Sequence, residues 1–174
     1  PIFCEAIAQC QVHREDLVFI APMATSEIYE IFSRQIASMV PTANIRLYDG
    51  QAREVLMAAD VAMIASGTAT LEALLCKCPM VVSYKMSKST WWYLKRKVTV
   101  DRFALPNHLA GHDVALELCQ ENARPELIAL EILRLLDSPE YVAHLRNEFT
   151  TIHRELRRDA SKQAAIAVQE VLSE

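Results

Sequence analysis

Short apolar runs alternate with helical patterns between residues 17 and 120. The apolar runs are continuous, which is typical of strands buried on both faces of a parallel sheet. The links between the expected elements are short, and right-handed crossovers then place helices on both faces of the sheet. The sequence therefore predicts an α/β fold, namely a Rossmann-like parallel sheet with helices on both faces plus C-terminal helices.

The expected elements can be assigned by residue range. Strands are predicted at 17–21, 45–48, 60–65, 80–84 and, more weakly, 103–105. Helices are predicted at 2–12, 26–40, 53–59, 68–76, 87–97, 114–120, 125–136, 139–157 and 160–172. We expect Pro22 to close the first strand, Ser26 to be the N-cap of the helix that follows, and Ser87 to cap the helix at 87–97.

Composition narrows the class of protein. A length of 174 residues suits one domain or one lobe of a larger protein, and the net charge of −4 argues against a general nucleic-acid binder. The five cysteines lack metal-site spacing, so we expect reduced core thiols and no metal site. We expect no signal peptide at the start of the chain and no membrane span, since no uncharged apolar stretch reaches about 18 residues. Because the chain opens within an apolar pattern, we expect it to be part of a longer polypeptide.

Glycine is scarce, and one glycine occupies an informative position. Only three residues are glycine, and Gly67 separates the predicted strand 60–65 from the predicted helix 68–76. Such a turn brings free N–H groups and the positive end of the helix dipole to the mouth of a parallel sheet. We predict that it holds the diphosphate of a nucleotide, although a capped helix without a ligand would fit the same pattern. The expected lining residues are Ser66, Gly67, Thr68, Ala69 and Thr70.

Three further polar residues are candidates for contacting a ligand. We place Glu72 in the first turn of the same helix, where the dipole alone would favour a carboxylate, but it would also suit two ribose hydroxyls. Asn107 and Gln120 carry neutral amides that suit sugar hydroxyls or a phosphate oxygen. The alternative is turn chemistry at Asn107 and a solvent-facing Gln120.

Both tryptophans lie beside a basic cluster in residues 88–97. Aromatic rings next to basic side chains are found where proteins contact a membrane surface. A helix whose tryptophans pack on the sheet while its lysines stay in water would show the same pattern. The sequence leaves both interpretations open.

Several segments together resemble one family of enzymes. They are Ser66-Gly-Thr-Ala-Thr-Leu-Glu72, Cys78-Pro-Met-Val-Val-Ser-Tyr84-Lys85, the aromatic and basic stretch, Leu105-Pro-Asn107-His-Leu-Ala-Gly111 and Glu117-Leu-Cys-Gln120. Their order and spacing are similar to those of lipid-A-disaccharide synthases, which are inverting glycosyltransferases of the two-lobed GT-B type. The resemblance implies that residues 1–137 form the UDP-binding α/β lobe. Residues 138–174 would be C-terminal helices packing on that lobe or on a neighbouring lobe or subunit.

The resemblance also implies substrates and residue roles. The donor would be UDP-2,3-diacylglucosamine and the acceptor 2,3-diacylglucosamine 1-phosphate. Ser66 to Thr70 would hold the diphosphate, Glu72 the ribose, and Asn107 and Gln120 would face the donor. The resemblance further implies a Leu-Pro-Gly-Ser-Arg loop just before Pro1 and an N-terminal lobe, outside these residues, with the acceptor site and the general base. We therefore assign no catalytic residue and expect the chain alone to be inactive.

The expected setting follows from the same resemblance. It implies a cytoplasmic protein of a Gram-negative bacterium and leaves open both a peripheral position on the cytoplasmic face of the inner membrane and a homodimer; the charge balance argues against nucleic-acid partners. No cofactor is implied, and the sequence has no Asp-x-Asp pattern for a divalent cation. The alternatives are another UDP-sugar GT-B enzyme, such as a UDP-GlcNAc epimerase or a peptidoglycan glycosyltransferase, and a non-catalytic α/β interaction domain.

Overall fold

Parallel strands form the centre of the protein and are arranged in two sheets. The structure is a computed structural model that describes residues 1–65, 67–87, 89–92 and 102–173. One sheet pairs β1 (Phe19–Met23) with β2 (Ile45–Asp49). The other has the order β3-β4-β5, with β3 at Ala62–Ile64, β4 at Met80–Tyr84 and β5 at Leu116–Cys119. All pairs among the described strands are parallel, as the sequence predicts.

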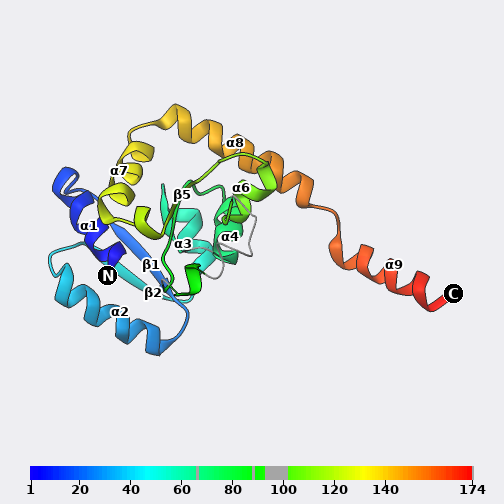
Figure 1. Cartoon of the computed structure of the whole chain (residues 1–174), viewed down its shortest axis with the longest axis horizontal. Helices are drawn as coiled ribbons and strands as arrows, with labels where there is room; N and C mark the ends of the chain where they lie inside the picture. Colours follow the sequence, from blue (N-terminus) through cyan, green and yellow to red (C-terminus); the bar gives the residue numbers. More distant parts are fainter. Residues whose placement is uncertain (66, 88, 93–101, 174) are drawn as a thin grey trace.

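The helices form two layers that cover the strands. One layer contains α1 (Ile2–His13), α2 (Ser26–Met39) and α7 (Pro125–Leu136), in which α1 packs on α2 and α7. The other contains α3 (Ala52–Ala58), α4 (Thr68–Cys76), α6 (Leu105–Ala110) and α8 (Pro139–Leu156), in which α4 packs on the other three. Figure 1 shows α1 beside α7, and α4 beside α6. The predicted α/β fold with helices on both faces is confirmed.

The core lies between these layers, around β4. Met80, Val81 and Val82 are fully buried in the middle of the second sheet, where both faces are covered. Cys4, Cys10 and Cys78 are buried, Cys76 and Cys119 are partly buried, and all five thiols are free. Burial raises the pKa of Cys10 to about 11 and of Cys78 to about 12, because the thiolate would lose its hydration. The prediction that the cysteines lie in the core is confirmed for Cys4, Cys10 and Cys78.

The predicted bounds of β1 and the predicted N-cap of α2 are each slightly wrong. β1 begins two residues later than predicted and contains Pro22, which pairs opposite Tyr48. Proline is tolerated here because its missing N–H lies on the side of β1 that faces away from β2. The N-cap of α2 is Thr25, not Ser26, because the Thr25 hydroxyl accepts the Ile28 N–H at 3.2 Å.

Two predictions between β4 and α7 are wrong. No strand forms at 103–105; instead α6 begins at Leu105, since Pro106 suits a first helical turn and Gly111 adopts a left-handed φ of 75° that ends the helix. The predicted helix at 114–120 is the strand β5, followed by a 3₁₀ turn at Gln120–Asn122. Pairing with β4 along its whole length decides that outcome, because it gives these backbone groups partners inside the core.

The C-terminal part is helical, as predicted. α9 (Ala160–Ser173) extends away from the rest of the chain in Figure 1, and its side chains from residue 160 to 172 are all exposed. The predicted boundary between residues 137 and 138 stays a prediction. Among the described helices, none is long and apolar enough to span a membrane.

Candidate functional site

The turn between β3 and α4 lies at the carboxyl edge of the second sheet. Gly67 has a φ of 133°, outside the range of ordinary side-chain-bearing residues, and it is the N-cap of α4. Its carbonyl oxygen accepts hydrogen bonds from the Thr70 N–H at 3.1 Å and from the Thr70 hydroxyl at 2.7 Å. Thr70 is fully buried, so its hydroxyl closes the first helical turn from inside the protein.

Two backbone donors remain available at this turn. Thr68 and Ala69 are exposed, and their N–H groups have no acceptor among the described residues. Free N–H groups at the start of a nine-residue helix, together with its dipole, favour an anion. Ser66, the fifth predicted lining residue, lies outside the described residues. The geometry therefore leaves Thr68 and Ala69 as the donors that an anion can reach.

Glu72 lies on the same helix but further along than predicted. It is the fifth residue of α4, so it is beyond the first turn, which contains no acidic residue. The dipole is weak at that position and does not account for the carboxylate. Glu72 is exposed, has no partner among the described residues, and borders a cavity that Ala69 also lines.

Asn107 is buried and its side chain is bound within the protein. Its Oδ1 accepts the N–H groups of Val114 and Ala115, each at 2.8 Å. Its Nδ2 donates to the Ala115 carbonyl oxygen at 2.8 Å and to Glu117 Oε1 at 2.7 Å. Glu117 in turn accepts the Phe103 N–H at 2.8 Å. Asn107 thus ties α6 to the residues that lead into β5, and the predicted contact with a sugar donor stays a prediction.

Gln120 is also buried, directly after the carboxyl end of β5. Its backbone adopts a φ of 53°, and its amide fits best with Nε2 donating to the Met86 carbonyl oxygen at 3.3 Å. In that orientation its Oε1 accepts the Met86 N–H at 3.2 Å. Gln120 therefore links the end of β5 to the segment that follows β4, and it does not face solvent.

Of the predicted site residues, Gly67 and Gln120 lie at the same edge of the second sheet, whereas Asn107 lies away from that edge. Gly67 and Gln120 both follow carboxyl ends, of β3 and β5, which lie on either side of β4. Two strand spacings amount to about 10 Å, a span that a diphosphate with its sugar can bridge. Asn107 instead contacts residues that precede and begin β5, away from that edge. Ligands of open α/β sheets bind at the carboxyl edge, which favours Thr68, Ala69 and Gln120 over Asn107.

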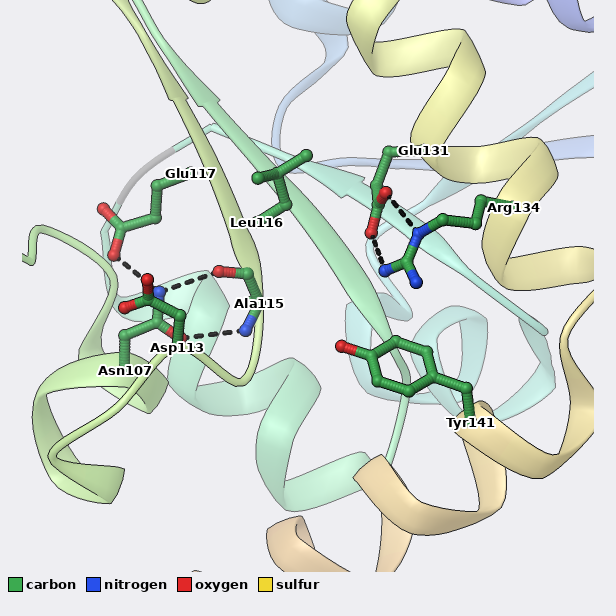
Figure 2. A pocket seen from close by; sticks show the side chains of 8 residues that line it. All are labelled: Asn107, Asp113, Ala115, Leu116, Glu117, Glu131, Arg134 and Tyr141. Carbon is green, nitrogen blue, oxygen red and sulfur yellow. Dashed lines mark hydrogen bonds and ion pairs between the residues drawn. The ribbon is translucent and has the colours of Figure 1, made fainter.

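A second hollow lies beside Asn107, between β5, α7 and α8. Figure 2 shows this cavity of about 320 Å³, with Asn107 and Glu117 on one side and Glu131, Arg134 and Tyr141 on the other. Arg134 donates to Glu131 at 2.6 and 2.7 Å and lies 4.5 Å from the centre of the Tyr141 ring. Hydrogen bonds to Glu131 raise the pKa of Arg134 above its ordinary value. The sequence reasoning missed this cluster, whose only signal is a Glu and an Arg three residues apart.

The charged groups of this second cavity are already paired with protein groups. Arg134 is held by Glu131, Glu117 by Asn107, and Asp113 by Arg102 at 2.8 Å. An anionic ligand would have to break one of these pairs to bind. We interpret the cluster as a connection between α7 and α8, since α8 supplies Tyr141.

The described part of the tryptophan segment begins as predicted. The Ser87 hydroxyl accepts the Thr90 N–H at 3.2 Å, and residues 89–92 are helical. Trp91 is partly buried with its ring 6.1 Å from that of Phe103, whereas Trp92 is 60% exposed. Lys88 and the predicted helix from 93 to 97, with its basic residues, lie outside the described residues.

The two parallel sheets, their helical layers and the glycine turn define an α/β domain of the Rossmann-like type. The chain belongs to the lipid-A-disaccharide synthetase family, whose model matches residues 1–171. It is 41% identical over 161 residues to the lipid-A-disaccharide synthase of Pectobacterium atrosepticum, covering 92% of this chain and 42% of that protein. It is 39% identical over 170 residues to the lipid-A-disaccharide synthase of Pectobacterium carotovorum, covering 98% of this chain and 44% of that protein.

A lipid-A-disaccharide synthase of Escherichia coli O157:H7 is 40% identical over 156 residues, covering 90% of this chain and 41% of that protein. The chain therefore spans less than half the length of these curated relatives. The recognition of the family from the sequence motifs is confirmed.

Proposed function

We propose that this chain is the donor-binding lobe of a glycosyltransferase that forms the lipid A disaccharide. It would act on UDP-2,3-diacylglucosamine as donor and 2,3-diacylglucosamine 1-phosphate as acceptor. The observation that carries the proposal is the match to the family along residues 1–171. The acceptor site and general base would lie on a further lobe, so glycosyl transfer would require both lobes.

The diphosphate would bind at the start of α4. Thr68 and Ala69 are exposed residues, and their N–H groups lack acceptors among the described residues. Negative charge grows on the β-phosphate as the UDP leaving group departs in an inverting transfer. Preorganised N–H donors at a helix N-terminus stabilise such charge without reorganisation. This part of the proposal requires no divalent cation, so a chelator should leave the activity of the whole enzyme unchanged.

The other predicted residues fit different parts of the donor. Glu72 is exposed, has no partner among the described residues, and would accept hydrogen bonds from the ribose hydroxyls. Gln120 would position the segment after β4 against the donor through its two bonds to Met86. Asn107 would act at a distance, by holding β5 and Glu117 in place.

A matched pair of glycine variants tests the diphosphate site. Gly67 and Gly50 both have a positive φ, and among the described residues a Cβ added to either would meet nothing within 4 Å apart from its chain neighbours. Gly50 has a φ of 66°, which other residues can adopt, so Gly50→Ala should cost about 1 kcal/mol. The φ of 133° and ψ of −163° at Gly67 are essentially restricted to glycine, so Gly67→Ala should cost more, about 1–3 kcal/mol, and UDP binding is compared at a temperature at which both variants are folded. Only Gly67→Ala places a methyl group where the diphosphate approaches, and it should weaken UDP binding at least about tenfold, or 1.4 kcal/mol. Equal UDP affinities for the two variants in calorimetric titration would show that the site lies elsewhere.

We also propose a contact with the cytoplasmic face of the inner membrane, where acylated substrates reside. The observation behind it is the 60% exposure of Trp92 next to a basic sequence. Trp92→Ser should reduce co-sedimentation with anionic vesicles, whereas Trp91→Ser should mainly reduce thermal stability through its contact with Phe103. Unchanged vesicle binding by both variants would remove the membrane from the proposal. A homodimer remains open, and sedimentation equilibrium would decide it.

A further inference from the structure

The end of α8 is attached to the end of α4 by a hydrogen bond between two basic side chains. Lys77 is the C-cap of α4, and its Nζ lies 2.6 Å from Nδ1 of His153 in the last turn of α8. The same Nζ donates to the carbonyl oxygens of Leu74 at 3.4 Å and Leu75 at 3.0 Å. A cation is favourable at this position, because the last carbonyl groups of a helix carry partial negative charge. Lys77 thus joins the C-terminus of α4 to α8.

This arrangement requires a neutral imidazole at His153. An ammonium group has three N–H donors and no acceptor. Two of the groups around Lys77 Nζ are carbonyl oxygens, which only accept, and the third is Nδ1 of His153. Nδ1 must therefore present its lone pair to Lys77, and the ring carries its hydrogen on Nε2. A second proton on the ring would place an N–H group directly against the ammonium and break the contact.

The surroundings of the contact disfavour a second positive charge. Burial lowers the pKa of Lys77, because its ammonium loses hydration. The ion pairs among the described residues include neither Lys77 nor His153. Glu131 and Glu148 are each paired with other side chains. The other titratable groups of α8 and of the helices packed against it are Glu72, Cys76, His108, Glu126, Arg134, Glu140, Tyr141, His144, Arg146, Arg154 and Glu155.

A second histidine contact, at the middle of α8, has the opposite charge requirement. Nδ1 of His112 lies 3.1 Å from the Ala110 carbonyl oxygen, and Nε2 lies 3.3 Å from both carboxylate oxygens of Glu148. Both partners accept hydrogen bonds, so both ring nitrogens carry hydrogen when both contacts are made, which is the imidazolium form. Acidification therefore strengthens this contact, although its exposure keeps it weak.

Burial distinguishes the last turn of α8 from the rest of the helix. Leu145, Phe149 and Ile152 are buried in the core and hold the helix at any pH. His153 is partly buried, and the side chains of α8 that follow it, from residue 154 to 156, are exposed. The last turn is therefore attached mainly through the contact between His153 and Lys77.

We propose that the last turn of α8 is a pH-sensitive contact, docked on the end of α4 while His153 is neutral and released when His153 gains a proton. Histidine is the side chain whose charge ordinarily changes between about pH 5 and 8, so release belongs to that range. The buried part of α8 stays in place, so the domain remains folded. Since α9 follows α8, protonation would free the connection that leads to α9. The proposal does not depend on UDP binding, because the Gly67 turn lies at the other end of α4.

Hydrogen exchange in the full-length protein tests the proposal. Mass spectrometry would follow exchange at about pH 7.5 and about pH 5.5, with each rate divided by the intrinsic rate at that pH. The amides of residues 153–157 should lose protection at least about tenfold at the lower pH, whereas those of residues 145–152 should keep theirs. Equal protection of residues 153–157 at the two pH values would overturn the proposal.

Variants of the two partners separate protonation of His153 from a general effect of acid. His153→Gln keeps an acceptor oxygen for Lys77 but cannot gain a proton, so its last turn should stay protected at both pH values. Lys77→Met removes the donor and should leave the last turn unprotected at both. His144→Gln, at an exposed position of the same helix, is the control and should retain the parent's pH dependence. Loss of protection at low pH in His153→Gln, to the same extent as in the parent, would contradict the proposal.

The protonation state of the His153 ring gives a readout that helix stability alone would not change. In the full-length protein labelled with ¹⁵N-histidine, the ring signals of His153 can be assigned by their absence from His153→Gln. At about pH 7.5 they should show hydrogen on Nε2 and a lone pair on Nδ1, and at about pH 5.5 hydrogen on both nitrogens. Hydrogen on Nδ1 at the higher pH would exclude Lys77 as the donor and refute the switch.

Discussion

Asn107 offers the sharpest test of how the structure positions β5. Its side chain makes four hydrogen bonds from a site that is 1% exposed. Asn107→Ala would leave the N–H groups of Val114 and Ala115 buried without acceptors. Each buried unsatisfied group costs about 1–3 kcal/mol, so the variant should lose about 2–6 kcal/mol of unfolding free energy. That loss is comparable with the whole stability of many domains.

A milder variant separates the donor bonds from the acceptor bonds. Asn107→Asp keeps an oxygen for the Val114 and Ala115 N–H groups but loses the donors to Ala115 and Glu117. It also places two carboxylates together, so its stability should recover in part when the pH is lowered through about 4, where carboxylates protonate. His108→Ala, at the exposed neighbouring position, is the matched control and should change stability by less than about 0.5 kcal/mol.

Urea unfolding followed by circular dichroism measures these differences, and UDP titration of the same variants gives a second readout. We expect the Asn107 variants to lose stability, and any loss of UDP affinity to follow from a displaced β5. An Asn107→Ala protein with unchanged unfolding free energy but much weaker UDP binding would refute it. The side chain would then act on the ligand directly.

Three further predictions each concern a single side chain. Glu72→Ala should weaken UDP binding about 10- to 100-fold in calorimetry, because it removes charge-assisted hydrogen bonds worth about 1.5–3 kcal/mol. An unchanged UDP affinity would show that the ribose binds elsewhere. Thr25→Ala should cost about 1 kcal/mol in urea unfolding and Ser26→Ala almost nothing, and the reverse order would restore Ser26 as the N-cap. Cys78 should react with a thiol reagent at pH 8 far more slowly than Cys76. Since folding raises the Cys78 pKa from 9.0 to about 12, this thiol's contribution to stability should be complete below pH 9 and decline as the pH rises toward 12.

The sequence by itself determined the class of fold and the central turn. Continuous apolar runs, a proline after a helix and a glycine between strand and helix act over a few residues, so they can be recognised without tertiary contacts. α4 and β4 accordingly have the predicted bounds of Thr68–Cys76 and Met80–Tyr84. The family motifs depend on residue order alone, and the match over residues 1–171 confirms them.

Tertiary structure decided the elements whose local signals were ambiguous. Residues 114–120 suit a helix locally, but pairing with β4 makes Leu116–Cys119 a strand, because only there do its backbone groups find partners in the core. Likewise, the amides of Asn107 and Gln120 are polar in sequence and would suit a sugar, yet the fold buries both and bonds them to backbone. A sequence lists the groups that can bond, whereas only the packed chain decides which partner each group meets.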